Sequence, residues 1–171
     1  MKGYVQVYTG NGKGKTTAAL GLAVRAVGAG MKVFIGQFVK GMHYSEQDVI
    51  NSNLESITVR QYGRDCFIIN EPTPEDKEAA QDGFERIRQT VRAGKHELVI
   101  LDELNIAIYY GLISLDEVLR LIKDKPSHVE LVITGRYAPD ELLEAADLVT
   151  EMKEMRHYYQ KGVQARKGIE F

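Results

Sequence analysis

A glycine-rich stretch near the start of the chain, residues 10–17, constrains the fold more than any other feature. It reads Gly-Asn-Gly-Lys-Gly-Lys-Thr-Thr and follows a strand-like segment at residues 3–9. An alanine- and leucine-rich segment, residues 15–29, comes next and is predicted to form a helix. A strand, a glycine-rich turn, a Lys-Thr pair and a helix together form a cradle for nucleotide phosphates. Glycine turns the backbone N–H groups inward, and the start of the helix adds a positive dipole.

The side chains of this stretch predict a division of roles. We expect Lys15 to reach the phosphates and the Thr16 hydroxyl to ligate Mg²⁺. In the usual pattern a glycine stands five positions before Gly14, but here that position is Thr9 and the glycine is Gly10, so the loop is one residue short. A purely structural glycine turn is the alternative interpretation. The helix, the lysine and the threonine weigh against it.

Length and composition narrow the class of protein. A chain of 171 residues with 44% hydrophobic residues predicts one globular domain, residues 1–171. The formal net charge of −2 argues against a protein that mainly binds nucleic acid. The single cysteine, Cys66, fits a reducing cytoplasm, and strand residues from Tyr4 onward argue against a signal peptide. No apolar run is long enough to cross a membrane, so no membrane partner is expected.

Strand-like and helix-like segments alternate along the chain. This pattern predicts an α/β fold of three layers, with a mostly parallel sheet and helices on both faces, as in P-loop NTPases of RecA type. The helix at residues 15–29 is apolar nearly all round, so we expect it to be buried against the sheet. We also expect a short helix capped by Ser45 and a helix that starts at Thr73-Pro74. Ser114 is predicted to start another helix, and no element is predicted for residues 157–171.

Charged residues follow two of the predicted strands, where ligands bind in parallel sheets. Asp102-Glu103 ends a buried strand and could hold Mg²⁺, although a solvated strand end is the alternative. Arg136 follows another strand and suits phosphate oxygens, although it could instead be a surface arginine paired with an acid. Arg25 could reach the nucleotide or extend to solvent. The four histidines lack metal-ligand spacing, so a zinc site is not expected.

Taken together, these motifs resemble the P-loop class of cob(I)alamin (corrinoid) adenosyltransferases, enzymes of cobalamin biosynthesis and salvage. The likeness runs from about Gly3 to the last residue, and the shortened loop is itself typical of that family. It is carried by residues 8–19, by Gly-Gln-Phe-Val-Lys-Gly at 36–41, by Leu-Asp-Glu-Leu at 101–104, by Val-Ile-Thr-Gly-Arg at 132–136 with Ala146-Asp147, and by residues 162–171.

The resemblance implies transfer of the adenosyl group of ATP to cobalt(I) of a corrinoid, with triphosphate as the leaving group. ATP would bind in the reverse sense to most P-loop proteins, with its ribose 5′-carbon open to cobalt. Residues implied to bind ATP are Gly10, Asn11, Gly12, Lys13, Gly14, Lys15, Thr16, Thr17, Arg25, Arg136 and His157. Thr16 and Glu103 would ligate Mg²⁺ or Mn²⁺, and Lys15, Thr16, Glu103 and Arg136 would form the catalytic set.

The resemblance also implies a homodimer, and it is compatible with a flavodoxin-like electron donor. Some relatives carry an N-terminal extension over the corrinoid and a tryptophan beside the cobalt, whereas this chain has no tryptophan. Phe67 is the predicted counterpart at the corrinoid, with Tyr62 as a second aromatic. Two other functions use the same loop: a RecA-like ATPase, which the net charge disfavours, and a small-molecule kinase, for which the sequence shows no arginine-rich lid.

Overall fold

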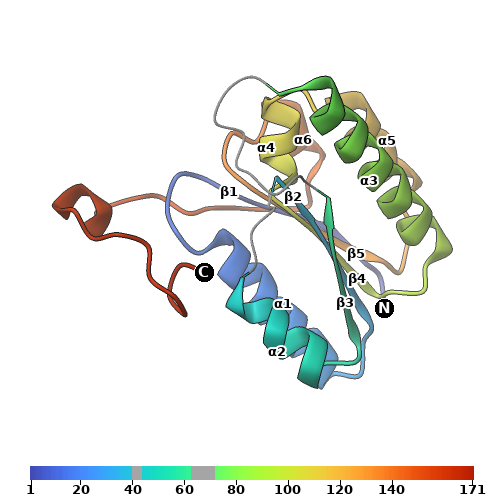
Figure 1. Cartoon of the computed structure of the whole chain (residues 1–171). Coiled ribbons are helices and arrows are strands. Elements are labelled where there is room, and N and C mark those ends of the chain that lie inside the picture. Colours follow the sequence, from blue (N-terminus) through green and yellow to red (C-terminus); the bar gives the residue numbers. More distant parts are fainter. Residues whose placement is uncertain (40–43, 63–71) are drawn as a thin grey trace.

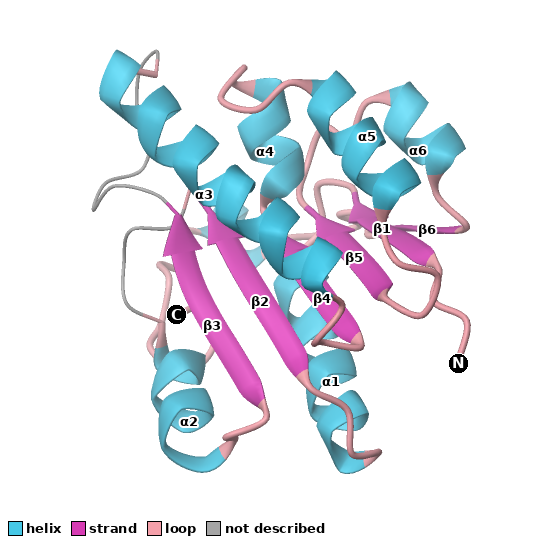
Figure 2. Cartoon of the chain, turned by 90° about the vertical axis from the view of Figure 1, so that its right-hand side faces the viewer, coloured by secondary structure: helices cyan, strands magenta, loops and turns pink. Residues whose placement is uncertain are grey.

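The centre of the molecule is a six-stranded sheet in which all neighbouring strands pair in parallel. The structure is a computed structural model that describes residues 1–39, 44–62 and 72–171. The strands are β1 (Val5–Thr9), β2 (Val33–Phe38), β3 (Ile57–Tyr62), β4 (Leu98–Asp102), β5 (Glu130–Thr134) and β6 (Leu148–Glu151). They lie in the order β3-β2-β4-β5-β1-β6 across the sheet (Figure 2).

Helices cover both faces of this sheet. Two of them, α1 (Lys15–Gly28) and α2 (Ser45–Asn53), lie on one face (Figure 1). The other face carries α3 (Pro74–Ala93), α4 (Leu104–Tyr109), α5 (Leu115–Asp124) and α6 (Asp140–Ala145). The predicted three-layer α/β architecture of P-loop NTPase type is therefore confirmed.

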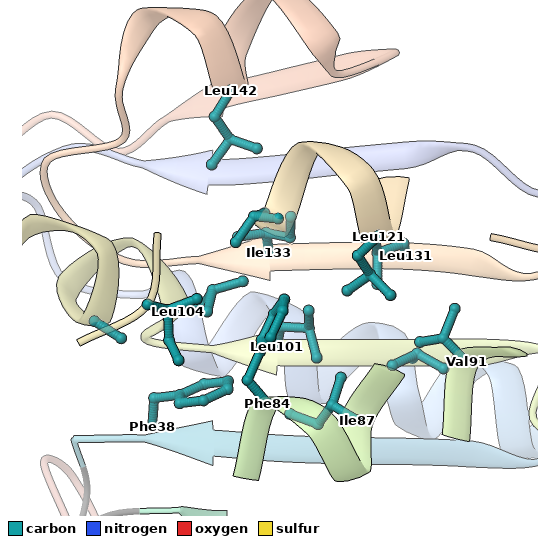
Figure 3. Packing of buried hydrophobic residues seen from close by; sticks show 14 of the residues in the cluster. Phe38, Phe84, Ile87, Val91, Leu101, Leu104, Leu121, Leu131, Ile133 and Leu142 are labelled. Atoms are coloured by element: carbon teal, nitrogen blue, oxygen red, sulfur yellow. The ribbon is translucent and has the colours of Figure 1, made fainter. Parts of the chain in front are cut away.

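The larger part of the hydrophobic core lies between the sheet and the second group of helices. In Figure 3, Phe84 and Ile87 of α3 pack over Leu101 of β4, and Leu121 of α5 lies over β5. These side chains are almost completely buried. Full burial of one such side chain contributes about 1.5–3 kcal/mol to folding. This packing holds β4 and β5, whose ends carry the candidate site, in a fixed relation.

Two helices on this face begin where the sequence predicts, because each has a capping box. At α3, the Thr73 hydroxyl accepts from the Asp76 N–H at 3.2 Å, and the Asp76 carboxylate accepts from the Thr73 N–H at 3.0 Å. Ser114 and Glu117 make the same exchange at α5. Each box satisfies N–H groups that would otherwise lack partners at a helix start.

On the opposite face one prediction is confirmed and one is wrong. The first helix is buried against the sheet as predicted, through Ala19, Ala23 and Ala26, whereas Val24 is 56% exposed. The sheet covers one side of α1 only, and apolar content alone does not say which side. The wrong prediction concerns Ser45, which is the first residue of α2 rather than its cap. Its hydroxyl donates to the main-chain oxygen of Phe171 at 3.2 Å.

The last part of the chain leaves the sheet after β6. It forms a short 3-10 helix, η1 (Tyr158–Lys161), away from the sheet, and then returns toward the start of α1 (Figure 1). The sequence predicted no element here, since the contacts that hold this part are with distant residues. Its return brings the end of the chain to the candidate site.

Candidate active site

A cavity of about 510 Å³ opens at the edge of the sheet where the strands end. The parallel arrangement explains its position, since the carboxyl ends of β1, β4 and β5 meet at one edge and carry the glycine-rich loop, Glu103 and Arg136. Several other parts of the chain complete the wall. The lining residues are Gly12, Lys13, Gly14, Lys15, Thr16, Thr17, Leu20, Tyr44, Ser45, Glu46, Glu103, Arg136, His157, Gly168, Ile169, Glu170 and Phe171.

Lys15 is the first residue of α1 and is held inside the glycine-rich loop. Its ammonium donates to the carbonyl oxygens of Gly10 at 2.7 Å and Gly12 at 2.8 Å. Burial lowers the pKa of this ammonium from its ordinary value, and Glu103 and Asp102 oppose that shift. A buried cation that lines a cavity and is surrounded by carbonyl oxygens is well placed to take an anionic partner.

The glycines of the loop are explained by the close approach of another segment. A side chain at Gly10 or Gly12 would lie 2.5 or 2.7 Å from the carbonyl oxygen of Met152, just beyond β6. The Gly12 N–H donates to that same oxygen at 2.6 Å. These two glycines therefore allow the backbone after β6 to close over the loop. From the sequence alone, phosphate binding was the only reason we could give for these two glycines.

Behind the loop, Asp102 is the centre of a buried hydrogen-bond network. Its carboxylate accepts from the Thr16 hydroxyl at 2.9 Å, from the Thr134 hydroxyl at 2.7 Å and from the Gln37 amide at 3.2 Å. Gln47 of α2 in turn donates to the Gln37 side-chain oxygen at 3.0 Å. The network joins α1, β4, β5, β2 and α2, so the Thr16 hydroxyl is fixed from several sides.

Three residues of this network, Gln37, Gln47 and Thr134, were not predicted from the sequence to support the site. Gln37 and Thr134 lie in two of the motifs that carry the family resemblance, but no role was predicted for them. The local signal at Gln37 and Thr134 is an uncharged polar residue within a mainly apolar strand. Their contacts depend on the register of β2, β4 and β5 rather than on neighbours in sequence.

The turns that follow the central strands have unusual backbone conformations. In the described part of the chain, the non-glycine residues with positive φ are Val39 (55°), Glu103 (60°) and Tyr137 (59°). They follow the ends of β2, β4 and β5 respectively. Such angles are uncommon outside glycine and gather at functional sites. At Glu103 the turn is held by its N–H, which donates to the Thr134 hydroxyl at 3.0 Å.

The remaining predicted residues divide into three groups. Arg136 and His157 lie on the cavity wall, and Arg136 also faces a neighbouring hollow together with Asn11. Arg25 is exposed on α1, and it is not among the residues that line the cavity. Phe67 lies outside the described residues. The structure thus brings most of the predicted residues to the cavity, whereas Gly10, Asn11 and Arg25 are not among its lining residues.

The donor set suits a magnesium ion that is held partly by its ligand. Among the described residues there is no group of three or more His, Cys, Asp or Glu side chains that could hold a metal alone. Mg²⁺ with a nucleotide needs only one or two protein oxygens beside phosphates and water. The Thr16 hydroxyl and the Glu103 carboxylate both line the cavity and are oxygen donors of that kind.

The fold and the site together define a P-loop nucleotide-binding protein. A strand, a glycine-rich loop, a helix that begins with Lys-Thr, and an acidic strand end across from them form one cavity. The chain belongs to the ATP:corrinoid adenosyltransferase BtuR/CobO/CobP family, whose sequence profile matches residues 1–171. It is therefore a transferase, as the resemblance implied.

Curated relatives agree with this family. A corrinoid adenosyltransferase of Sinorhizobium sp is 36% identical, and the match covers 99% of this chain and 81% of the relative. One from Pseudomonas aeruginosa is also 36% identical, over 99% of this chain and 84% of the relative. One from Escherichia coli K12 is 34% identical, and the match covers 99% of this chain and 86% of the relative. Within the described residues, no helix is long and apolar enough to span a membrane.

Proposed function

We propose that this protein transfers the 5′-deoxyadenosyl group of ATP to cobalt(I) of a corrinoid such as cobalamin or a cobyrinic acid derivative. The proposal is supported chiefly by one observation: the cavity at the sheet edge gathers Lys15, Thr16, Glu103 and Arg136 in a member of the corrinoid adenosyltransferase family. The cobalt electron pair forms the bond to the ribose 5′-carbon. The carbon–oxygen bond breaks, and triphosphate leaves with its electron pair.

The proposed roles follow from the charge of the leaving group. Cobalt(I) is a strong nucleophile, so the protein needs no general base; it has to orient the reactants and stabilise the departing triphosphate. In this proposal, N–H groups of the glycine-rich loop and the Lys15 ammonium hold the triphosphate, and the Arg136 guanidinium binds phosphate oxygens in pairs. The Asp102 network fixes Thr16, and His157 borders the nucleotide.

A divalent ion completes the proposed site. Thr16 and Glu103 would hold Mg²⁺ or Mn²⁺, and the ion would neutralise part of the phosphate charge. The residues themselves keep their positions through contacts already present, since Thr16 is bonded to Asp102 and the turn at Glu103 is held by Thr134. The Thr16 hydroxyl and the backbone at Glu103 are therefore already oriented before the ion binds.

An anaerobic assay tests the reaction. The protein is mixed with ATP, Mg²⁺ and chemically reduced cobalamin, and the products are separated by chromatography. We expect adenosylcobalamin and intact triphosphate in equal amounts. A RecA-like ATPase would instead release ADP and phosphate, and a kinase would transfer phosphate to an acceptor. ADP without an alkylated corrinoid would therefore contradict the proposal.

Three further assignments accompany this function and stay predictions. Phe67 is proposed to lie against the corrinoid, with Tyr62 of β3 nearby in sequence. A homodimer is proposed from the family resemblance. A flavodoxin-like protein is proposed as the electron donor, because cobalt(I) must be generated before each transfer.

A further inference from the structure

The last residues of the chain lie against the glycine-rich loop. We name residues 166–171 the C-terminal strap. Gly168, Ile169, Glu170 and Phe171 all line the nucleotide cavity. Figure 1 shows the end of the chain beside the start of α1. The strap is thus a wall of the cavity contributed by the opposite end of the sequence.

Lys13 of the loop is directed at this strap. Its ammonium donates to the Ile169 carbonyl oxygen at 2.9 Å, to the Glu170 carboxylate at 3.0 Å and to the Tyr158 hydroxyl at 3.4 Å. An ammonium has three N–H donors, so these partners account for all of them. Lys15 differs, because two of its donors bond loop carbonyls and the third remains for a phosphate. The two lysines of the motif therefore serve different partners.

Glu170 also has partners within the C-terminal part of the chain, whereas Lys13 bonds it to the glycine-rich loop. Its carboxylate accepts from the Tyr158 hydroxyl, from the Arg166 N–H at 2.8 Å and from the Arg166 guanidinium at 3.4 Å. The Tyr158 hydrogen bond, with Lys13 and Arg166, lowers the pKa of the Glu170 carboxyl far below its ordinary range. The carboxylate is accordingly charged at neutral pH. At the end of the strap, Ser45 of α2 bonds the Phe171 main-chain oxygen.

We propose that Lys13 and Glu170 form a latch that holds the C-terminal strap as a wall of the ATP site. Lys13 is then a positioning residue that acts on ATP through the strap, and its side chain is not a phosphate ligand. A strap already fixed by this ion pair loses less conformational entropy when the nucleotide arrives. The proposal rests on the function above only in that ATP occupies this cavity.

A double-mutant cycle on ATP binding tests the latch. The variants are Lys13→Ala, Glu170→Ala and the double variant, and the dissociation constant for ATP with Mg²⁺ is measured by calorimetry without a corrinoid. We expect each single variant to weaken binding about three- to tenfold, as for a charged hydrogen-bonded pair near the surface. The double variant should bind no more weakly than the weaker of the two single variants, because both changes release the same strap.

A matched control is the ion pair between Arg92 of α3 and Asp124 of α5, 3.2 Å apart on the opposite face of the sheet. Asp124→Ala removes a cross-element ion pair of the same kind and should leave the ATP dissociation constant unchanged. The charge-reversed variant, Lys13→Glu with Glu170→Lys, should bind ATP more tightly than Lys13→Glu alone. Thermal unfolding shows whether each alanine variant folds. If one does not, the charge-reversed variant provides a second test of the latch.

Three outcomes would overturn the latch. Additive losses would mean that Lys13 and Glu170 act separately, with Lys13 on the nucleotide itself. Tighter binding by Glu170→Ala would mean that the carboxylate competes with triphosphate for Lys13. Unchanged binding in both single variants would mean that the strap plays no part. Each outcome is distinct from a failure of adenosyl transfer, because no corrinoid is present in the measurement.

Discussion

At the scale of single residues, Lys15 is the side chain on which the proposed chemistry depends most. It is buried, lines the cavity and holds an ammonium among the loop carbonyls. Lys15→Ala should lower kcat by about 10²–10³-fold, as the loss of one preorganised charge contact to a leaving group does. Steady-state kcat under anaerobic conditions measures this effect. Lys13→Ala is the matched control, and its main effect should be on the KM for ATP.

A kcat for Lys15→Ala within twofold of the unaltered protein would remove Lys15 from this role. A fall in kcat of the same size in both lysine variants would also contradict the distinction between them. Circular dichroism of each variant separates loss of chemistry from loss of fold. The comparison is sharp because the two side chains have the same charge and length and are two positions apart.

Local patterns predicted the part of the site that lies in one segment, and contacts between segments supplied the rest. The loop, Lys15 and Thr16 follow from spacing within a few residues. The partners of Asp102 could not be predicted in this way, because Gln37, Gln47 and Thr134 reach it only through the order and register of the strands. Likewise, nothing local to Glu170 predicts a bond to Lys13.

At the scale of elements, two helical glycines have opposite surroundings and should respond oppositely to alanine. Gly83 of α3 faces Tyr62 at the end of β3, and an added Cβ would lie 2.5 Å from the ring. Gly83→Ala should lower the free energy of unfolding by about 1–3 kcal/mol, because the close packing leaves no room. Gly21 of α1 has nothing within 4 Å of the added atom. Gly21→Ala should therefore raise the same free energy by about 0.5–1 kcal/mol, through helix propensity alone.

Urea unfolding of both variants measures these changes, and each serves as the control for the other. A stabilised Gly83→Ala variant would show that β3 and α3 can separate without cost, which is incompatible with Tyr62 lying in this slot. A Gly21→Ala variant that is destabilised would show that the outer side of α1 is covered in solution. The latter result would support a homodimer interface on this side of α1.

Elements were predictable where their signals are local. The starts of α3 and α5 were correct because capping boxes are set by residues three positions apart. Which side of α1 faces the sheet could not be predicted locally, because apolar residues lie on nearly all its sides. In the structure the side with Ala19, Ala23 and Ala26 is buried against the sheet. Serine is a common N-cap residue, but the Ser45 hydroxyl donates a hydrogen bond to the main-chain oxygen of Phe171, at the other end of the chain.

At the scale of the whole molecule, the cavity and the main hydrophobic core are separated. The core between the sheet and α3, α5 and α6 sets the relation of the central strands (Figure 3). The cavity wall instead consists of loops and ends: the glycine-rich loop, the start of α2, the turns after β4 and β5, and the C-terminal strap. These parts are joined mainly by polar contacts, so they have less hydrophobic packing to stabilise them than the core does.

Ligand binding should therefore stabilise the molecule, with its largest local effect on the cavity wall. At a concentration 100 times its dissociation constant, ATP with Mg²⁺ should add about 2.7 kcal/mol to the free energy of unfolding. For a chain of this size that corresponds to a rise in Tm of about 5–10 °C. Thermal unfolding measures the rise, and chelation of Mg²⁺ should reduce it if the ion bridges Thr16, Glu103 and phosphate.

Amide hydrogen exchange under native conditions then locates the effect. Protection on ATP binding should increase at residues 10–17, at the start of α2 and in the C-terminal strap, whereas α3 and α5 on the opposite face should change little. In Glu170→Ala the protection of the strap should be lost, and that of the glycine-rich loop should remain, because Lys15 still holds the triphosphate. Equal protection of the strap in this variant and in the unaltered protein would mean that ATP itself, and not the Lys13–Glu170 pair, holds the strap in place.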